Sequence, residues 1–184
     1  MAFRRIVLAA AVATFAIPAS AAVLVIGNSS ARLCYEAADS NLVPTPAALG
    51  YCDSALTNDT LTTDDTVATH VNRGILLMRR HQIDNAIADF DTAMQLDPDQ
   101  PEAYLNKGVA LLQMENYGEA LGLFNTAIAR NTRRPEIAYY GRAIANETLG
   151  HVRAAYNDYR QASQISPNWR EPQIELTRFR IVSR

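Results

Sequence analysis

The feature that most constrains this chain is an internal repeat with a period of about 34 residues. Gly74 and Gly108 lie one period apart, and the same spacing separates Ala86 from Ala120, Phe90 from Phe124, and Ala93 from Ala127. A third copy carries one extra residue, so that Ala143, Ala155, Tyr159 and Ala162 stand one period and one residue after their counterparts in the second. A repeat of this size predicts one supersecondary unit per copy, stacked on its neighbours.

Each copy has the pattern of two helices joined by a turn. Residues 68–80 contain no proline, and residues 83–96 place apolar side chains three and four positions apart, which predicts one buried stripe per helix. Asp97 precedes Pro98, and proline disfavours helix in the residue before it. Small residues such as Gly74 let the paired helices approach closely. A single hairpin cannot bury its own apolar faces, so the copies must stack.

The repeated positions resemble those of the tetratricopeptide repeat family. They are His70, Gly74, Leu77, Ala86, Phe90, Ala93 and Pro98 in the first copy; Tyr104, Gly108, Leu111, Ala120, Phe124 and Ala127 in the second; and Tyr139, Ala143, Ala155, Tyr159, Ala162 and Pro167 in the third. The resemblance covers residues 67–169. It implies an all-α fold, a right-handed α-solenoid of stacked helix hairpins.

The segments on either side of the repeats are predicted to cap them. Ala48, Cys52 and Ala55 copy the spacing of small and aromatic positions in the repeats, which predicts a degenerate leading hairpin. Ile174, Leu176 and Phe179 are spaced for one buried face of a closing helix over 171–180. The predicted segments are 1–21 (signal peptide), 22–66 (leading hairpin and linker), 67–100, 101–135 and 136–169 (three repeats), and 170–184 (capping helix).

The N-terminus has the pattern of a secretory signal peptide. Arg4 and Arg5 precede an uncharged apolar stretch, and small residues follow Pro18. We predict cleavage after Ala21. The alternative is an uncleaved membrane anchor over residues 6–26, a stretch that approaches the length needed to span a bilayer. Both interpretations place the repeats outside the cytoplasm, in a periplasmic or secreted location.

The two cysteines fit an exported protein. Cys34 and Cys52 both lie in the segment that precedes the repeats, and disulfides persist in oxidising compartments. Closing the loop between them would stabilise a fold by about 3 kcal/mol in the chain-entropy model. The alternative is a pair of buried free thiols that pack as small apolar residues.

Resemblance to this family implies a concave groove, lined by the first helix of each hairpin, that holds a peptide or a partner helix. Most of the groove positions are apolar, and an exposed apolar patch marks a binding surface. Two are asparagines, whose amides both donate and accept hydrogen bonds and could bind a ligand backbone. The alternative is that these side chains pack on neighbouring helices. The expected groove residues are Val71, Asn72, Ile75, Met78, Leu105, Asn106, Val109, Leu112, Tyr140 and Ile144.

Some members of the family hold a peptide's terminal carboxylate with a cluster of Lys, Arg and Asn, and this chain departs from that pattern. Only Asn106 matches, because Val71, Ile137 and Gly141 occupy the expected basic positions. A carboxylate-binding groove is therefore not expected.

No pattern for catalysis, a cofactor or a metal site stands out. His70, His81 and His151 lie in different parts of the sequence, and the common nucleophile, phosphate and zinc motifs do not occur. The 17 Lys and Arg nearly balance the 19 Asp and Glu, which argues against a nucleic-acid partner. We expect an exported, non-catalytic scaffold that binds a protein or peptide. The alternative is a membrane-anchored structural protein that self-associates.

Overall fold

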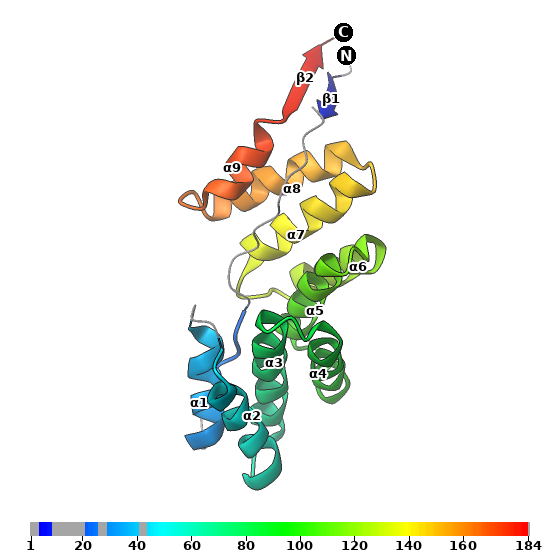
Figure 1. Cartoon of the computed structure of the whole chain (residues 1–184). Helices are drawn as coiled ribbons and strands as arrows, with labels where there is room; N and C mark the ends of the chain where they lie inside the picture. Colours follow the sequence, from blue (N-terminus) through cyan, green and yellow to red (C-terminus); the bar gives the residue numbers. More distant parts are fainter. Residues whose placement is uncertain (1–3, 9–20, 26–28, 41–43, 184) are drawn as a thin grey trace.

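The computed structural model describes residues 4–8, 21–25, 29–40 and 44–183, and in this part the chain is a stack of helices with one short strand pair. Figure 1 shows the helices following one another along a long axis, from α1 at one end to α9 at the other. The elements are β1 (Arg4–Leu8), α1 (Ser29–Asp39), α2 (Pro46–Asn58), α3 (Thr63–Arg79), α4 (Ile83–Leu96), α5 (Pro101–Gln113), α6 (Tyr117–Ala129), α7 (Pro135–Thr148), α8 (Val152–Ile165), α9 (Arg170–Leu176) and β2 (Phe179–Ser183).

The predicted all-α repeat fold is confirmed. Helices α3 and α4, α5 and α6, and α7 and α8 form three consecutive hairpins (Figure 1). The extra residue of the third copy is accommodated at the start of α7, which is 14 residues long where α5 has 13. Helix α3 begins at Thr63, before the predicted first repeat, because Thr62 caps it: its hydroxyl oxygen accepts from the Asp65 amide at 3.1 Å.

Buried aromatic side chains form the core of the repeats, and the two phenylalanines among them pack against glycines. Phe90, Phe124 and Tyr159 are fully buried at equivalent positions of α4, α6 and α8. A Cβ added to Gly74 would lie 2.5 Å from Phe90 Cε1, which is closer than van der Waals contact allows. The absence of a side chain at Gly74 therefore lets the helices of this hairpin approach closely enough to bury the ring.

The predicted disulfide is present and ties the leading hairpin together. Cys34 of α1 and Cys52 of α2 are bonded, with 4.9 Å between their Cα atoms, and both are fully buried. The hairpin packs on α3, and Arg79 of α3 donates to the carbonyl oxygens of Ala38 and Ser40 at the end of α1. The disulfide thus joins the two helices of the leading hairpin, and hydrogen bonds from Arg79 hold the hairpin on the first repeat.

The prediction of one capping helix over 171–180 is wrong in its second half. Helix α9 ends at Leu176, and Phe179 begins β2, which pairs antiparallel with β1. Ile174 is 54% exposed, whereas Phe179 is buried against the rings of Tyr156 and Tyr159. The residues after Arg178 include Ile and Val, which favour strand, and they pair with the similar sequence of β1.

The predicted signal peptide lies mostly outside the described residues. Its described parts are β1 and Ala21, and residues 21–25 have no helical structure. None of the described helices is long and apolar enough to cross a membrane.

Candidate binding groove

The ten predicted groove residues line one side of α3, α5 and α7, but they do not form an open surface. Every one of them is at most 8% exposed, and several are fully buried, Asn72 and Asn106 among them. The ten residues therefore do not form the exposed apolar patch that was expected of them. Two parts of the chain itself, residues 21–25 and the region of α9, pack against these positions.

Residues 21–25 lie over α3 and α5 as an extended segment. Ala21, Val23 and Val25 are 3–5% exposed and belong to the same buried cluster as the groove residues, whereas Leu24 is 50% exposed. This alternation is that of a strand with one buried face. In Figure 1 the segment is the blue stretch beside α3. It is the part of the site that the sequence analysis missed.

Two asparagines one repeat apart hold the backbone of this segment. Asn72 Nδ2 donates to the Val23 carbonyl oxygen at 2.7 Å, and the Val23 amide donates to Asn72 Oδ1 at 2.8 Å. Asn106 repeats the arrangement with Ala21, at 3.1 Å to its carbonyl oxygen and 3.3 Å from its amide. One repeat along the solenoid therefore matches a step from Ala21 to Val23 along the segment.

The third repeat has no asparagine at the position of Asn72 and Asn106. Gly141 stands where Asn72 and Asn106 stand, and a Cβ there would lie 2.4 Å from Phe124 Cζ. The ring of Phe124 thus excludes any side chain at this position of α7. The described groove has two amides that bind backbone, one from α3 and one from α5.

The third repeat is covered instead by the C-terminal part of the chain. Tyr140 packs on Trp169 and Tyr159, with ring centroids 4.6 Å and 5.5 Å away. Burial raises the pKa of Tyr140 well above its usual value, and nearby glutamates, Glu175 foremost, raise it further. Its hydroxyl therefore stays protonated at neutral pH and in mild base.

A buried ion cluster holds α9 on α7. Arg178 pairs with both Glu147 of α7 and Glu175 of α9, and the Tyr159 hydroxyl donates to Glu147 Oε2 at 2.9 Å. Burial and the charge of Glu147 raise the pKa of Tyr159. Glu147 occupies the repeat position of the apolar Met78 and Leu112, so this end of the groove is closed by charge pairing.

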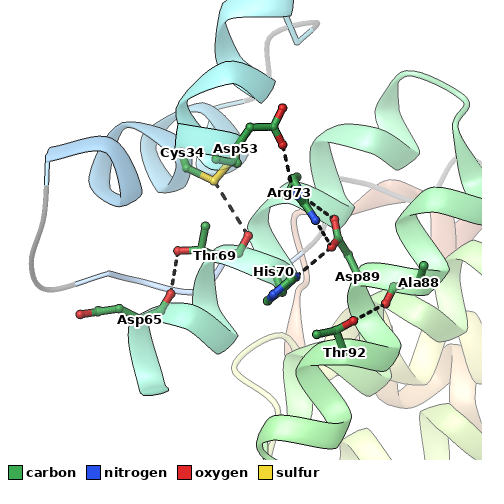
Figure 2. A network of polar contacts seen from close by, with 10 residues as sticks. Cys34, Asp53, Asp65, Thr69, His70, Arg73, Ala88, Asp89 and Thr92 are labelled. Atoms are coloured by element: carbon green, nitrogen blue, oxygen red, sulfur yellow. Dashed lines mark hydrogen bonds and ion pairs between the residues drawn. A yellow bond between two sulfur atoms is a disulfide. The ribbon is translucent and has the colours of Figure 1, made fainter. Parts of the chain in front are cut away.

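A second polar cluster joins α2, α3 and α4 (Figure 2). The Arg73 guanidinium donates to both oxygens of Asp89, at 2.7 and 2.8 Å, and to Asp53 at 2.9 Å, while His70 Nδ1 lies 2.9 Å from Asp89. The third repeat has the same bidentate pair, Arg142 with Asp158. The cluster borders a cavity of about 380 Å³ lined by Leu49, Asp53, Arg73, Leu77, Gln82, Asn85, Ala88 and Asp89. Because the arginine–aspartate pair recurs in the third repeat, we interpret the cluster as part of the packing within each hairpin.

Asp89 makes the stability of the first repeat sensitive to acid. Burial alone would raise the pKa of Asp89, but hydrogen bonds from Arg73 and His70 outweigh it and lower the pKa below its usual value. A lowered pKa stabilises the fold above the unfolded-state value, and the contribution disappears as the pH falls through the folded-state value. We expect the free energy of unfolding to fall below about pH 4. Urea titrations from pH 7 to pH 2.5 measure this, and Asp89→Asn should flatten the profile; an unchanged profile contradicts the assignment.

The structure does not bring the three histidines together. His70 bonds Asp89, His81 lies in the turn between α3 and α4, and His151 Nδ1 is 3.2 Å from Asn146 Oδ1. Within the described ranges, no three His, Cys, Asp or Glu side chains are placed to hold a metal ion.

Comparison with known proteins agrees with this architecture. The family described as tetratricopeptide repeat matches residues 77–143, which run from the end of α3 through α4, α5 and α6 and into α7. Residues 77–143 match the tetratricopeptide repeat (TPR) family, and the chain has the fold of TPR proteins. Among curated proteins, none matches this chain.

Solved structures of TPR proteins share the fold. The first TPR of Spaghetti (RPAP3), bound to the HSP90 peptide SRMEEVD, is 26% identical, with a TM-score of 0.58 over 61% of this chain and 88% of that one. YrrB, a TPR protein with an unusual peptide-binding site, is 22% identical, with a TM-score of 0.56 over 60% of this chain and 56% of that one. MamA is 23% identical, with a TM-score of 0.60 over 70% of this chain and 72% of that one.

Proposed function

We propose that this TPR protein is an exported scaffold that binds a protein or peptide partner in the groove of α3 and α5, without catalysing a reaction. The observation that carries the proposal is the pair of amides at Asn72 and Asn106. Each both donates to and accepts from a peptide backbone, and together they are spaced for an extended chain. An amide pair of this kind binds any extended segment through its backbone, whatever its side chains.

The predicted location outside the cytoplasm rests on two independent features. The N-terminal sequence has the charge and apolar pattern of a signal peptide. Cys34 and Cys52 are disulfide-bonded, and structural disulfides persist in oxidising compartments. Both features support export.

The solved relatives support a peptide partner but not one of the same chemistry. One is bound to the peptide SRMEEVD, which carries two glutamates and a terminal aspartate. The groove here presents amides and the buried apolar side chains of Val71, Ile75 and Leu105. An acidic peptide would lose hydration there without gaining a cationic partner from these positions.

Replacing Asn72 with alanine tests the proposal. The test is made in a chain carrying Val23→Asp, a charge at a buried position that should release residues 21–25 from Asn72. In that chain the loss of two hydrogen bonds worth about 1 kcal/mol each should weaken partner binding about 30-fold. The measurement is affinity capture from the cell envelope with tagged wild-type protein, followed by titration of the captured partner against each variant. Asn125→Ala in the same chain, at an exposed asparagine on α6, is the matched control and should leave binding unchanged.

Asn72 is preferred to the apolar groove residues because Leu105 and Tyr140 are part of the packed core. A charged side chain at either position would unfold the protein, so the loss of binding would not report on the groove. Partner affinity that is the same in Val23→Asp alone and in Val23→Asp combined with Asn72→Ala or Asn106→Ala would contradict the groove assignment.

A further inference from the structure

We propose that residues 21–25 are an intramolecular substitute for the partner, and that the partner is an uncharged extended segment with small or β-branched side chains at alternate positions. This inference rests on the proposed function and specifies its ligand. The partner would occupy in trans the place that Ala21, Val23 and Val25 occupy in cis.

The backbone contacts show that the groove accepts a strand in one direction. Asn106 of the second repeat holds Ala21 and Asn72 of the first repeat holds Val23, so the bound segment runs against the order of the repeats. The bonds involve only main-chain groups of the segment. A partner in the same extended conformation and direction reproduces all of them.

Side-chain burial specifies the pattern of the ligand. Ala21, Val23 and Val25 are buried among apolar groove residues, whereas Leu24 between two of them is half exposed. Small and β-branched side chains fit an extended backbone lying close to the helices. A charged residue at a buried position would lose its hydration without compensation, so charge is excluded there and tolerated at the position of Leu24.

The position of the segment in the chain makes it a competitor. Residues 26–28 alone separate Val25 from the first residue of α1. A short connection of this kind gives an effective concentration of about a millimolar, which lowers the apparent affinity of any partner. Cleavage after Ala21, which the sequence predicts, would remove the residue bound by Asn106 and leave Val23 bound to Asn72. The half of the groove on α5 would then be free for a partner before the half on α3.

The test uses the whole protein and a synthetic peptide. The probe is a fluorescein-labelled peptide with the sequence of residues 20–27, SAAVLVIG, followed by three lysines for solubility. In the chain, Val23→Asp places a charge at a buried position and should release the segment. Leu24→Asp places the same charge one residue away at an exposed position and is the matched control.

We expect Val23→Asp to bind the probe at least tenfold more tightly than the wild type, and Leu24→Asp to bind it as the wild type does. Adding Asn72→Ala to Val23→Asp should weaken binding about 30-fold. Equal affinity of the wild type and Val23→Asp would overturn the inference, as would insensitivity to Asn72→Ala. A wild-type dimer with exchanged segments, detected by light scattering, would also overturn it.

A second measurement needs no variant of the chain. Excess probe added to the wild-type protein should speed amide hydrogen exchange in residues 21–25, and a probe with aspartate in place of its valine corresponding to Val23 should not. Unchanged exchange at saturating probe would contradict displacement. If the probe neither binds nor displaces residues 21–25 while partner binding still depends on Asn72, the inference is wrong and the proposed function stands. If the probe binds as expected while partner binding does not depend on Asn72, the proposed function is wrong.

Discussion

Replacing Phe124 with alanine is expected to lower the free energy of unfolding by about 3–5 kcal/mol. Phe124 is fully buried, and its ring lies against two glycines from different helices. The ring reaches Gly108 in its own hairpin and Gly141 in the next, so it joins two repeats. Neither glycine has a side chain that could fill the space left by the ring. The cavity would therefore persist at the junction between repeats.

Urea denaturation followed by circular dichroism measures this effect. Leu123→Ala, one residue away on α6 and only partly buried, is the matched control and should cost about 1 kcal/mol or less. A loss below about 1 kcal/mol for Phe124→Ala, the size expected of the control, would show that the two repeats are not joined through this ring.

Removing the disulfide by replacing both Cys34 and Cys52 with serine is expected to cost about 3 kcal/mol. The bond closes the hairpin of α1 and α2, and its two half-cystines are fully buried. Because a solenoid is stabilised by contacts between neighbouring units, the loss should concentrate at the end formed by α1, α2 and α3. Amide exchange should rise there and stay unchanged in α7 and α8.

The same comparison can be made without mutation by adding a reductant. Oxidised and reduced wild-type protein should differ in their urea midpoints, whereas the double-serine variant should not respond to reductant. Equal midpoints for the oxidised and reduced wild type would contradict a stabilising role for the bond.

Most of the fold could be predicted from the repeat period, because local sequence patterns determine the helix hairpins. The spacing shared by Gly74 and Gly108 with the other repeated positions, together with helix periodicity inside each copy, predicted the hairpins and the family. The closing helix was predicted too long because Phe179 fits a helical spacing as well as a strand. Only pairing with β1, at the other end of the chain, decides between them.

The groove residues of the candidate site could be predicted from the sequence, but the segment bound to them could not. The resemblance to the TPR family singled out Asn72 and Asn106, and the amide chemistry indicated a backbone ligand. The ligand itself could not be predicted, because Val23 and Asn72 are 49 residues apart and no local pattern connects them. The sequence has no alternating strand signal at this segment either, because all five residues from Ala21 to Val25 are apolar. The segment also continues an apolar stretch that fits a signal peptide and its flank.

The most direct test of the central claim is the exchange rate of one amide hydrogen. The Val23 amide donates to Asn72 Oδ1 in a buried position, so in ¹⁵N-labelled wild-type protein it should exchange at least a hundredfold more slowly than in an unstructured chain. The protection should disappear in Asn72→Ala and persist in Asn125→Ala. Exchange of the Val23 amide at the unstructured rate in the wild-type protein would contradict the account.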